Sequence, residues 1–269
     1  MENIDNVSAY LSIGLLVALL VWESGAPFFD AFRGEPRRRV IHAGRNLFFT
    51  VANAIMISLG FAALWLWAAN MAAANRFGIL YWLNLSPGAG LIVSLLFFDL
   101  WTYWWHRLNH RIPFLWRFHR MHHSDPQMDV TTANRFHLGE IAISSLLRVP
   151  LILLIGAPLW HLALYEALMF PVVQFHHANV GLPHWLDRTL RIILVTPAMH
   201  KVHHSRWQPE TDSNYTSMLS IWDRLFGTFR MREDLHSIRL GLDGFDDHEH
   251  QSLKGLLKTP LNQKSAKSQ

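Results

Sequence analysis

Cysteine is absent from this chain of 269 residues. Disulfide bonds, thiolate zinc sites, iron–sulfur clusters and cysteine nucleophiles are therefore excluded, and any metal ion must be bound through nitrogen or oxygen. Charge is also scarce, because Asp, Glu, Lys and Arg make up 16% of the chain, against about 25% in an average soluble domain. With 51% hydrophobic residues, the composition excludes a disordered chain and argues against an ordinary soluble globule.

Three long runs without a charged residue predict membrane-crossing helices. They cover residues 6–22, 47–75 and 77–98, and about 17 to 25 residues are needed to cross about 30 Å of hydrocarbon. A fourth apolar region covers residues 141–175 and carries Gly156-Ala157-Pro158 near its middle. Because Gly and Pro interrupt helices, we expect two arms folded back at that turn. The predicted fold class is an all-α, multi-pass membrane protein with about four membrane-crossing helices or hairpin arms and a cytoplasmic histidine-rich cap.

The arginines predict the orientation of these runs. Five lie between the first two runs, whereas only Arg76 lies between the second and third. By the positive-inside tendency the arginine-rich loop is cytoplasmic, and the third run returns the chain to the cytoplasm. The first run follows Glu2 and Asp5 and ends without a small-residue cleavage pattern, so we expect no cleaved signal peptide. The net charge of +4 is not gathered in a basic stripe with interleaved aromatic residues, so we expect no nucleic acid partner.

The same pattern predicts the domain organisation. We expect an N-terminal transmembrane region over residues 1–95, a histidine-rich domain over residues 96–230 and a polar C-terminal tail over residues 231–269, solvated from Lys254 onward. The hairpin at 141–175 makes an even number of passes. The segments before and after it can therefore share one site on the cytoplasmic side.

Histidine is unusually frequent, with 17 residues, and many of them form three clusters. One cluster has two histidines at i and i+4, and the other two have three at i, i+3 and i+4. Residues at these spacings lie on one helix face with Cβ atoms about 5 to 6 Å apart, close enough for imidazoles to share a metal at about 2.0 to 2.2 Å. Eight or nine ligands exceed what one ion of four to six ligands can use, so we predict two metal ions. The clustered histidines are His106, His110, His119, His122, His123, His200, His203 and His204.

Three further histidines lie near the clusters in the sequence. His177 is the preferred ninth ligand, and His176 and His137 are weaker candidates. For His137, direct ligation and a supporting hydrogen bond are equally compatible with the sequence. The remaining histidines lack paired spacing and receive no role.

Two polar residues are candidate catalytic residues. Asp99 lies in an apolar stretch and shares one helical stripe with His106 and His110. Because an unpartnered buried carboxylate would cost several kcal/mol, we expect Asp99 to accept a hydrogen bond from a ligand imidazole of another cluster and so fix its tautomer. Glu166 has a similar relation to His177, or is neutral and packed between helices. Asn179 either holds a metal-bound water or caps a helix end.

Around these clusters the sequence resembles the fatty acid hydroxylase/sterol desaturase superfamily of integral-membrane, non-haem di-iron oxygenases. The resemblance covers residues 96–230, and it implies that this part of the chain is the di-metal catalytic domain. It rests on Asp99, Trp105-His106-Arg107, His110, Leu115-Trp116-Arg117-Phe118-His119, His122-His123-Ser124, Arg135-Phe136-His137, His177-Ala178-Asn179, Thr196-Pro197, His200, His203-His204-Ser205, Asn214-Tyr215 and Trp222-Asp223-Arg224-Leu225-Phe226-Gly227-Thr228.

The resemblance implies two iron ions, O2 as co-substrate and removal of hydrogen from a lipid C–H bond. Hydroxylation, desaturation and ether cleavage are all compatible with it, and so are sterol, fatty acyl and related lipids entering from the bilayer. The sequence contains no dinucleotide fingerprint and no haem motif, so we expect a separate reductase, ferredoxin or cytochrome to supply electrons. Arg117 and Arg135 either dock this donor or follow the positive-inside rule. We expect a bacterial inner membrane, with the histidine clusters on its cytoplasmic side.

The residues alone leave other functions open. Imidazole suits zinc, copper, iron and nickel alike, so ligand type does not select the metal. A membrane-embedded zinc-dependent lipid hydrolase would need one ion, one carboxylate base and no electron donor. A metal transporter would distribute its histidines along the spans toward both sides, which the clustering argues against.

Overall fold

The computed structural model describes residues 2–262, with side chains from residue 10 onward. Among these residues all regular structure is helical, and β pairing is limited to the isolated bridges Leu194–Leu219 and Ser205–Leu240. This confirms the all-α prediction. The longer helices are α1 (Glu2–Gly25), α2 (Pro36–Gly60), α3 (Ala62–Ala74), α5 (Pro87–Arg111), α7 (Leu138–Ile155) and α8 (Leu159–His177).

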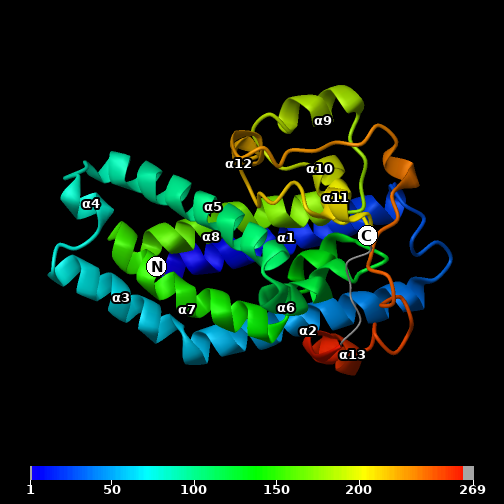
Figure 1. Cartoon of the computed structure of the whole chain (residues 1–269), viewed down its shortest axis with the longest axis horizontal. Coiled ribbons are helices and arrows are strands. Elements are labelled where there is room, and N and C mark those ends of the chain that lie inside the picture. Colours follow the sequence, from blue (N-terminus) through cyan, green and yellow to red (C-terminus); the bar gives the residue numbers. More distant parts are fainter. Residues whose placement is uncertain (1, 263–269) are drawn as a thin grey trace.

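Most of these helices run along the long axis of the molecule, and α10, α11 and α13 lie toward the end opposite α4 (Figure 1). The shorter helices are α4 (Ile79–Trp82), α6 (Pro113–His123), η1 (Val130–Asn134), α9 (His184–Leu190), α10 (Pro197–His203), α11 (Gln208–Thr211), α12 (Ile221–Leu225), η2 (Leu235–Ser237), α13 (Leu253–Lys258) and η3 (Thr259–Leu261).

Within the described part of the chain, two helices, α2 and α7, are long and apolar enough to cross a membrane. A third crossing results if Ala62–Trp82 and Pro87–Arg111, which are bent by 86° at their junction, form one broken span. The apolar part of α1, Tyr10–Gly25, is shorter. The structure therefore supports two or three crossing helices, and the expected number of about four stays a prediction.

The hairpin expected within residues 141–175 is confirmed. Helix α7 ends at Gly156, whose φ of 72° is left-handed, and α8 begins after Pro158. A glycine adopts this conformation without the Cβ clash that other residues meet. The turn brings the start of α7 and the end of α8 to the same end of the molecule, which is where the histidines lie.

At the end of the molecule opposite the histidines, the turn at Gly78 and the turn at Gly156 are in close backbone contact. A Cβ atom on Gly78, whose φ is 113°, would lie 2.5 Å from the backbone nitrogen of Gly156. We expect Gly78→Ala to lower the free energy of unfolding by about 2 to 4 kcal/mol, because both the backbone conformation and the contact become strained. Thermal unfolding in detergent measures this effect. Gly88→Ala is the matched control, since a Cβ there meets nothing within 4 Å, and equal melting of the two variants would contradict the contact.

The C-terminal part of the described chain is packed onto α6. The Arg120 guanidinium donates to the carbonyl oxygens of Thr259 and Asn262, both at 2.5 Å, and Leu256 is fully buried. The expectation of a solvated tail from Lys254 is therefore wrong for residues 254–262, because α13 and η3 supply an apolar contact and two carbonyl acceptors. Residues 263–269 of that prediction lie outside the described residues.

Candidate metal centre

Nine imidazoles converge in two adjoining groups at the buried junction of α5, α6, α8 and α10. Within each group, one nitrogen from every ring lies within 4.8 Å of the others. The five-histidine group is His106, His110, His119, His123 and His203, and the four-histidine group is His122, His177, His200 and His204. The structure thus brings together all eight clustered histidines and His177.

Each group contains imidazoles from both triple-histidine motifs. Of the first motif, His119 and His123 belong to the five-histidine group and His122 to the other. In the second motif the two groups are exchanged: His200 and His204 belong to the four-histidine group, and His203 belongs to the five-histidine group. The i and i+4 residues of each motif therefore point to one group, while the i+3 residue points to its neighbour.

The short helices that carry these motifs start at defined signals. Helix α10 begins at Pro197 after Thr196, whose hydroxyl accepts the backbone N–H of Met199 at 3.4 Å. Helix α6 begins at Pro113. Proline is favoured at the first helical position because its fixed φ suits the helix and its missing N–H would have no partner within the helix there.

Hydrogen bonds fix ring tautomers in the five-histidine group. His106 Nδ1 donates to the carbonyl of Tyr215, and His203 Nδ1 donates to the carbonyl of Ser213, both at 2.6 Å. In a neutral imidazole the other nitrogen then carries a lone pair. The two Nε2 atoms lie 3.0 Å apart, so two lone pairs face each other. A cation between them would convert this repulsion into ligation.

The four-histidine group repeats this arrangement. His177 Nδ1 donates to the carbonyl of Val173 at 2.7 Å. Its Nε2 lies 3.1 Å from His122 Nε2 and 2.9 Å from His200 Nε2, and His200 and His204 are separated by 3.1 Å. Both groups therefore fit a metal ion by their donor chemistry and by their convergence.

The burial of these rings keeps them neutral. Burial, followed by the neighbouring imidazoles, holds the pKa of His122, His123 and His204 well below the ordinary value. Burial also lowers the pKa of His203 to about 3. Because metal ligation requires the unprotonated ring, these imidazoles are ready to bind a cation at neutral pH.

Two carboxylates support ligands of the five-histidine group, and the sequence reasoning missed both. His119 Nδ1 donates to Glu140 Oε1 at 2.9 Å, and His110 Nδ1 lies 3.4 Å from Asp212 Oδ1. Such carboxylates orient a ligand imidazole and raise its basicity. Glu140 carries a usable signal, because it is an acidic residue in the first turn of an apolar helix. Asp212 lies in a polar segment without a comparable signal.

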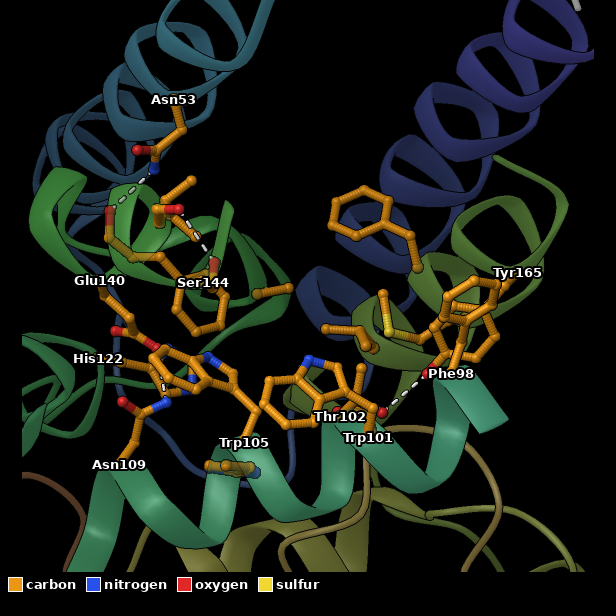
Figure 2. Close-up of a pocket in the computed structure, with 18 of the residues that line it drawn as sticks. Asn53, Phe98, Trp101, Thr102, Trp105, Asn109, His122, Glu140, Ser144 and Tyr165 are labelled. Carbon is orange, nitrogen blue, oxygen red and sulfur yellow. Dashed lines mark hydrogen bonds between the residues drawn. The ribbon is translucent and has the colours of Figure 1, made fainter. Parts of the chain in front are cut away.

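An apolar cavity leads from the membrane-crossing helices to the histidines. Its volume is about 380 Å³. In Figure 2, Trp101 and Trp105 project from α5, with His122 near one end of the cavity and Phe98 and Tyr165 near the other. Its lining also includes the histidines His106, His119, His176, His177 and His200 and the apolar residues Ile57, Leu151, Ile152, Leu162 and Met169.

The sequence profile of the fatty acid hydroxylase family matches residues 91–228, which is 138 of the 269 residues. The chain belongs to the fatty acid hydroxylase family. The matched region contains all nine histidines of the two groups as well as Glu140 and Asp212. The segment that matches the family therefore contains the buried metal-binding candidates of this family member.

Several curated proteins are similar to this family member. It is 35% identical to an ornithine lipid hydroxylase of Rhizobium tropici over 171 residues, which is 61% of this chain and 49% of the relative. It is 33% identical to the human alkylglycerol monooxygenase over 138 residues, covering 51% of this chain and 29% of that protein. A human cholesterol 25-hydroxylase is 25% identical over 142 residues, covering 52% of this chain and 51% of the relative. The matches thus span about half, or less, of these relatives, and no solved structure matches the chain.

Asp99 is placed differently from the prediction. Its carboxylate accepts hydrogen bonds from Tyr165 Oη at 3.1 Å, Trp222 Nε1 at 2.7 Å and the backbone N–H of Leu219 at 3.2 Å. Within residues 2–262, these donors replace the expected ligand imidazole, so that hydrogen-bond prediction is wrong. The physical reason is long-range folding, since the α12 region brings an indole N–H to a carboxylate that also needs partners.

The side chain of Asn179 was expected to hold a metal-bound water or to cap a helix end, but in the structure it binds a loop instead. Its side chain accepts the backbone N–H of Phe29 at 2.9 Å and donates to the carbonyl of Phe29 at 2.8 Å. Both polar atoms of the amide thus hold the loop after α1 against the segment that follows α8.

His137 and His176 lie outside the two groups. His137 Nδ1 accepts the backbone N–H of Gly139 at 2.9 Å, so this residue caps the start of α7. His176 is buried and stacks on His200 with ring centroids 3.9 Å apart, and neither of its nitrogens has a hydrogen-bond partner among residues 2–262. It lines the cavity instead of joining a group.

The structure also shows the surroundings of the charged residues for which the sequence left two roles open. Arg135 is buried and donates to the carbonyl of Met121 at 2.9 Å, so it is an internal support and not part of a docking surface. Arg117 is exposed. Glu166 pairs with Arg148 at 2.5 Å, which replaces both expected roles of that carboxylate.

Proposed function

We propose that this chain is a membrane-bound di-iron oxygenase that uses O2 and external electrons to hydroxylate or desaturate a lipid C–H bond. The observation that carries the proposal is an apolar cavity whose inner end is lined by members of two neutral imidazole groups. An apolar channel suits an alkyl chain or a sterol. The relatives, named for their action on ornithine lipid, alkylglycerol and cholesterol, support the same substrate class.

The number of ring nitrogens supports a pair of redox-active ions over a single catalytic zinc. A catalytic zinc site usually takes three protein ligands and a water, whereas the two groups together offer nine imidazoles. Imidazole itself suits zinc, copper, iron and nickel alike, so metal analysis decides between these ions.

In this proposal the two groups would each hold one iron ion, and the bound pair would supply O2 activation and hydrogen abstraction from carbon. Glu140 and Asp212 orient His119 and His110. The aromatic walls formed by Trp101 and Trp105 exclude water and position the alkyl chain. His176, with both nitrogens unsatisfied at the cavity wall, lies where it can contact the substrate.

The proposed setting is a bacterial inner membrane with the histidine groups on the cytoplasmic side. The arginine-rich loop between α1 and α2 supports this orientation. A separate reductase, ferredoxin or cytochrome would deliver the electrons at the exposed side of the histidine-rich end.

The experiment is a lipid screen with isotopically labelled O2. Protein from iron-replete cells is incubated with a chemical reductant and with ornithine lipid, alkylglycerol, sterol or fatty acyl lipids. We expect one class to gain an oxygen atom from O2 or to lose two hydrogen atoms. Hydrolysis of a lipid without O2 or reductant would contradict the proposal and favour a zinc hydrolase.

Filling the cavity should separate substrate binding from metal binding. Ser144 lines the cavity, and we expect Ser144→Phe to lower turnover by about 10-fold or more because the larger side chain occupies the lipid's space. Bound metal should be unchanged. Leu146→Phe is the matched control, because Leu146 lies on the same helix and is 55% exposed. Equal turnover of the two variants would show that the cavity is not the substrate site.

A further inference from the structure

The lobe that follows α8 exposes an apolar surface beside two basic residues. We define the α9–α12 face as Trp185, Ile192, Ile193, Ile221 and Leu225 together with the exposed Arg188 and Arg224. The five apolar side chains are between 52% and 69% exposed. Scattered exposed apolar residues are ordinary, but a group of five large ones marks an interaction surface.

Hydrogen bonds and one β-bridge join the segment after α9 to the segment that leads into and through α12. Leu194 and Leu219 form a β-bridge, and the backbone N–H of Ser220 donates to the carbonyl of Ile193 at 2.9 Å. The guanidinium of Arg224 donates to the carbonyl of Arg191 at 2.6 Å. The segment after α9 is therefore held against the start of α12, so its exposed isoleucines form part of an ordered face.

The lobe is anchored to a helix of the membrane region. Trp222 and Leu219 donate to Asp99 on α5, and the Phe226 ring lies 5.1 Å from the ring of Tyr103 and 5.0 Å from that of Trp104. In Figure 1, α12 lies near α5, and α9 lies farther out, at the upper edge of the molecule.

The outer surface of α5 continues the apolar character of the lobe. Ile92 is 60% exposed, Leu96 43% and Trp104 37%. Residues in a bent pair that is apolar enough to cross a membrane expose such side chains to lipid. The α9–α12 face therefore adjoins the surface that lipid is expected to cover.

We propose that the α9–α12 face lies in the headgroup region of the bilayer and fixes the histidine-rich end on the membrane surface. Trp185 and the isoleucines would insert at the boundary of headgroups and acyl chains, while Arg188 and Arg224 would contact lipid phosphates. Binding at this depth combines burial of apolar side chains with attraction of basic side chains to anionic lipid. The α9–α12 face contains both kinds of side chain. The inference depends on the membrane setting and not on the proposed reaction.

The cysteine-free chain allows a direct test with one fluorescent label. A nitrobenzoxadiazole label is placed at Ile192→Cys, and the full chain is reconstituted in phosphatidylcholine vesicles containing phosphatidylglycerol. Nitroxide-labelled lipids then report contact with the bilayer, and iodide reports contact with water. We expect strong quenching by lipid nitroxides and weak quenching by iodide at this position.

Two further labels make the outcome decisive. Asp243→Cys, exposed elsewhere on the chain, should be quenched by iodide alone, and Leu154→Cys on α7 should be quenched by lipid nitroxides. If Leu154 responds to lipid and Ile192 only to iodide, the face does not touch the membrane and the proposal is overturned. Shielding at Ile192 that depends on protein concentration and not on lipid nitroxides would overturn it in favour of contact between copies.

Discussion

Replacing His203 or His204 with alanine should each cost about one metal ion per chain and lower turnover by about 100-fold or more. The two residues are adjacent in sequence but belong to different groups, His203 to the five-histidine group and His204 to the four-histidine group. Removing a ligand leaves the buried site with an incomplete donor set. Metal content by mass spectrometry, measured beside turnover, checks the result.

Double variants test the division into two groups. His123→Ala with His203→Ala removes two ligands from the five-histidine group and should leave about one metal ion bound. His203→Ala with His204→Ala removes one ligand from each group and should empty both. His184→Ala is the control, because this histidine is exposed and lies outside both groups. Equal metal loss in the two double variants would contradict the division.

Glu140→Ala should weaken metal binding by about 10- to 100-fold without removing a ligand. Glu140 Oε1 accepts the Nδ1 proton of His119 at 2.9 Å, which directs His119 Nε2 toward the five-histidine group. Without the carboxylate, the imidazole loses both its fixed tautomer and part of its basicity. Competition with a chelator measures the change in affinity.

The same measurement on Glu140→Gln separates charge from orientation. The amide keeps an oxygen acceptor but carries no charge, so we expect an intermediate affinity. Glu166→Gln on α8 is the control, because Glu166 pairs with Arg148 and lies outside both histidine groups. If Glu140→Ala bound metal as tightly as this control, the carboxylate would have no part in holding the site.

Local sequence patterns predicted the helical class of this protein and the histidines that converge in it. The turn at Gly156-Ala157-Pro158 follows from residue chemistry within a few positions, and the structure confirms it. The histidine spacing predicted which rings share a helix face, and the nine preferred histidines do converge. The turn and the spacing within each motif depend on residues three or four positions apart, which a sequence displays directly, whereas the convergence of the motifs depends on how α5, α6, α8 and α10 pack.

The remaining features depend on contacts between distant segments. The partners of Asp99 come from Trp222 and Leu219, more than a hundred residues along the chain. The amide of Asn179 serves a loop 150 residues earlier. No periodic pattern in the sequence indicates hydrogen bonds between such distant residues. The spacing therefore identified the buried polar residues correctly but did not predict their hydrogen-bond partners. For the same reason, the sequence did not predict that Asp212 contacts His110 or that α13 packs onto the rest of the chain.

The most direct test of the account is the iron and zinc content per chain of detergent-purified wild-type protein from iron-replete cells. The account predicts about two iron ions per chain, one for each histidine group. A single zinc ion with no iron would contradict it and favour hydrolytic chemistry. A folded preparation without bound metal would contradict the inference that the nine imidazoles form a metal centre.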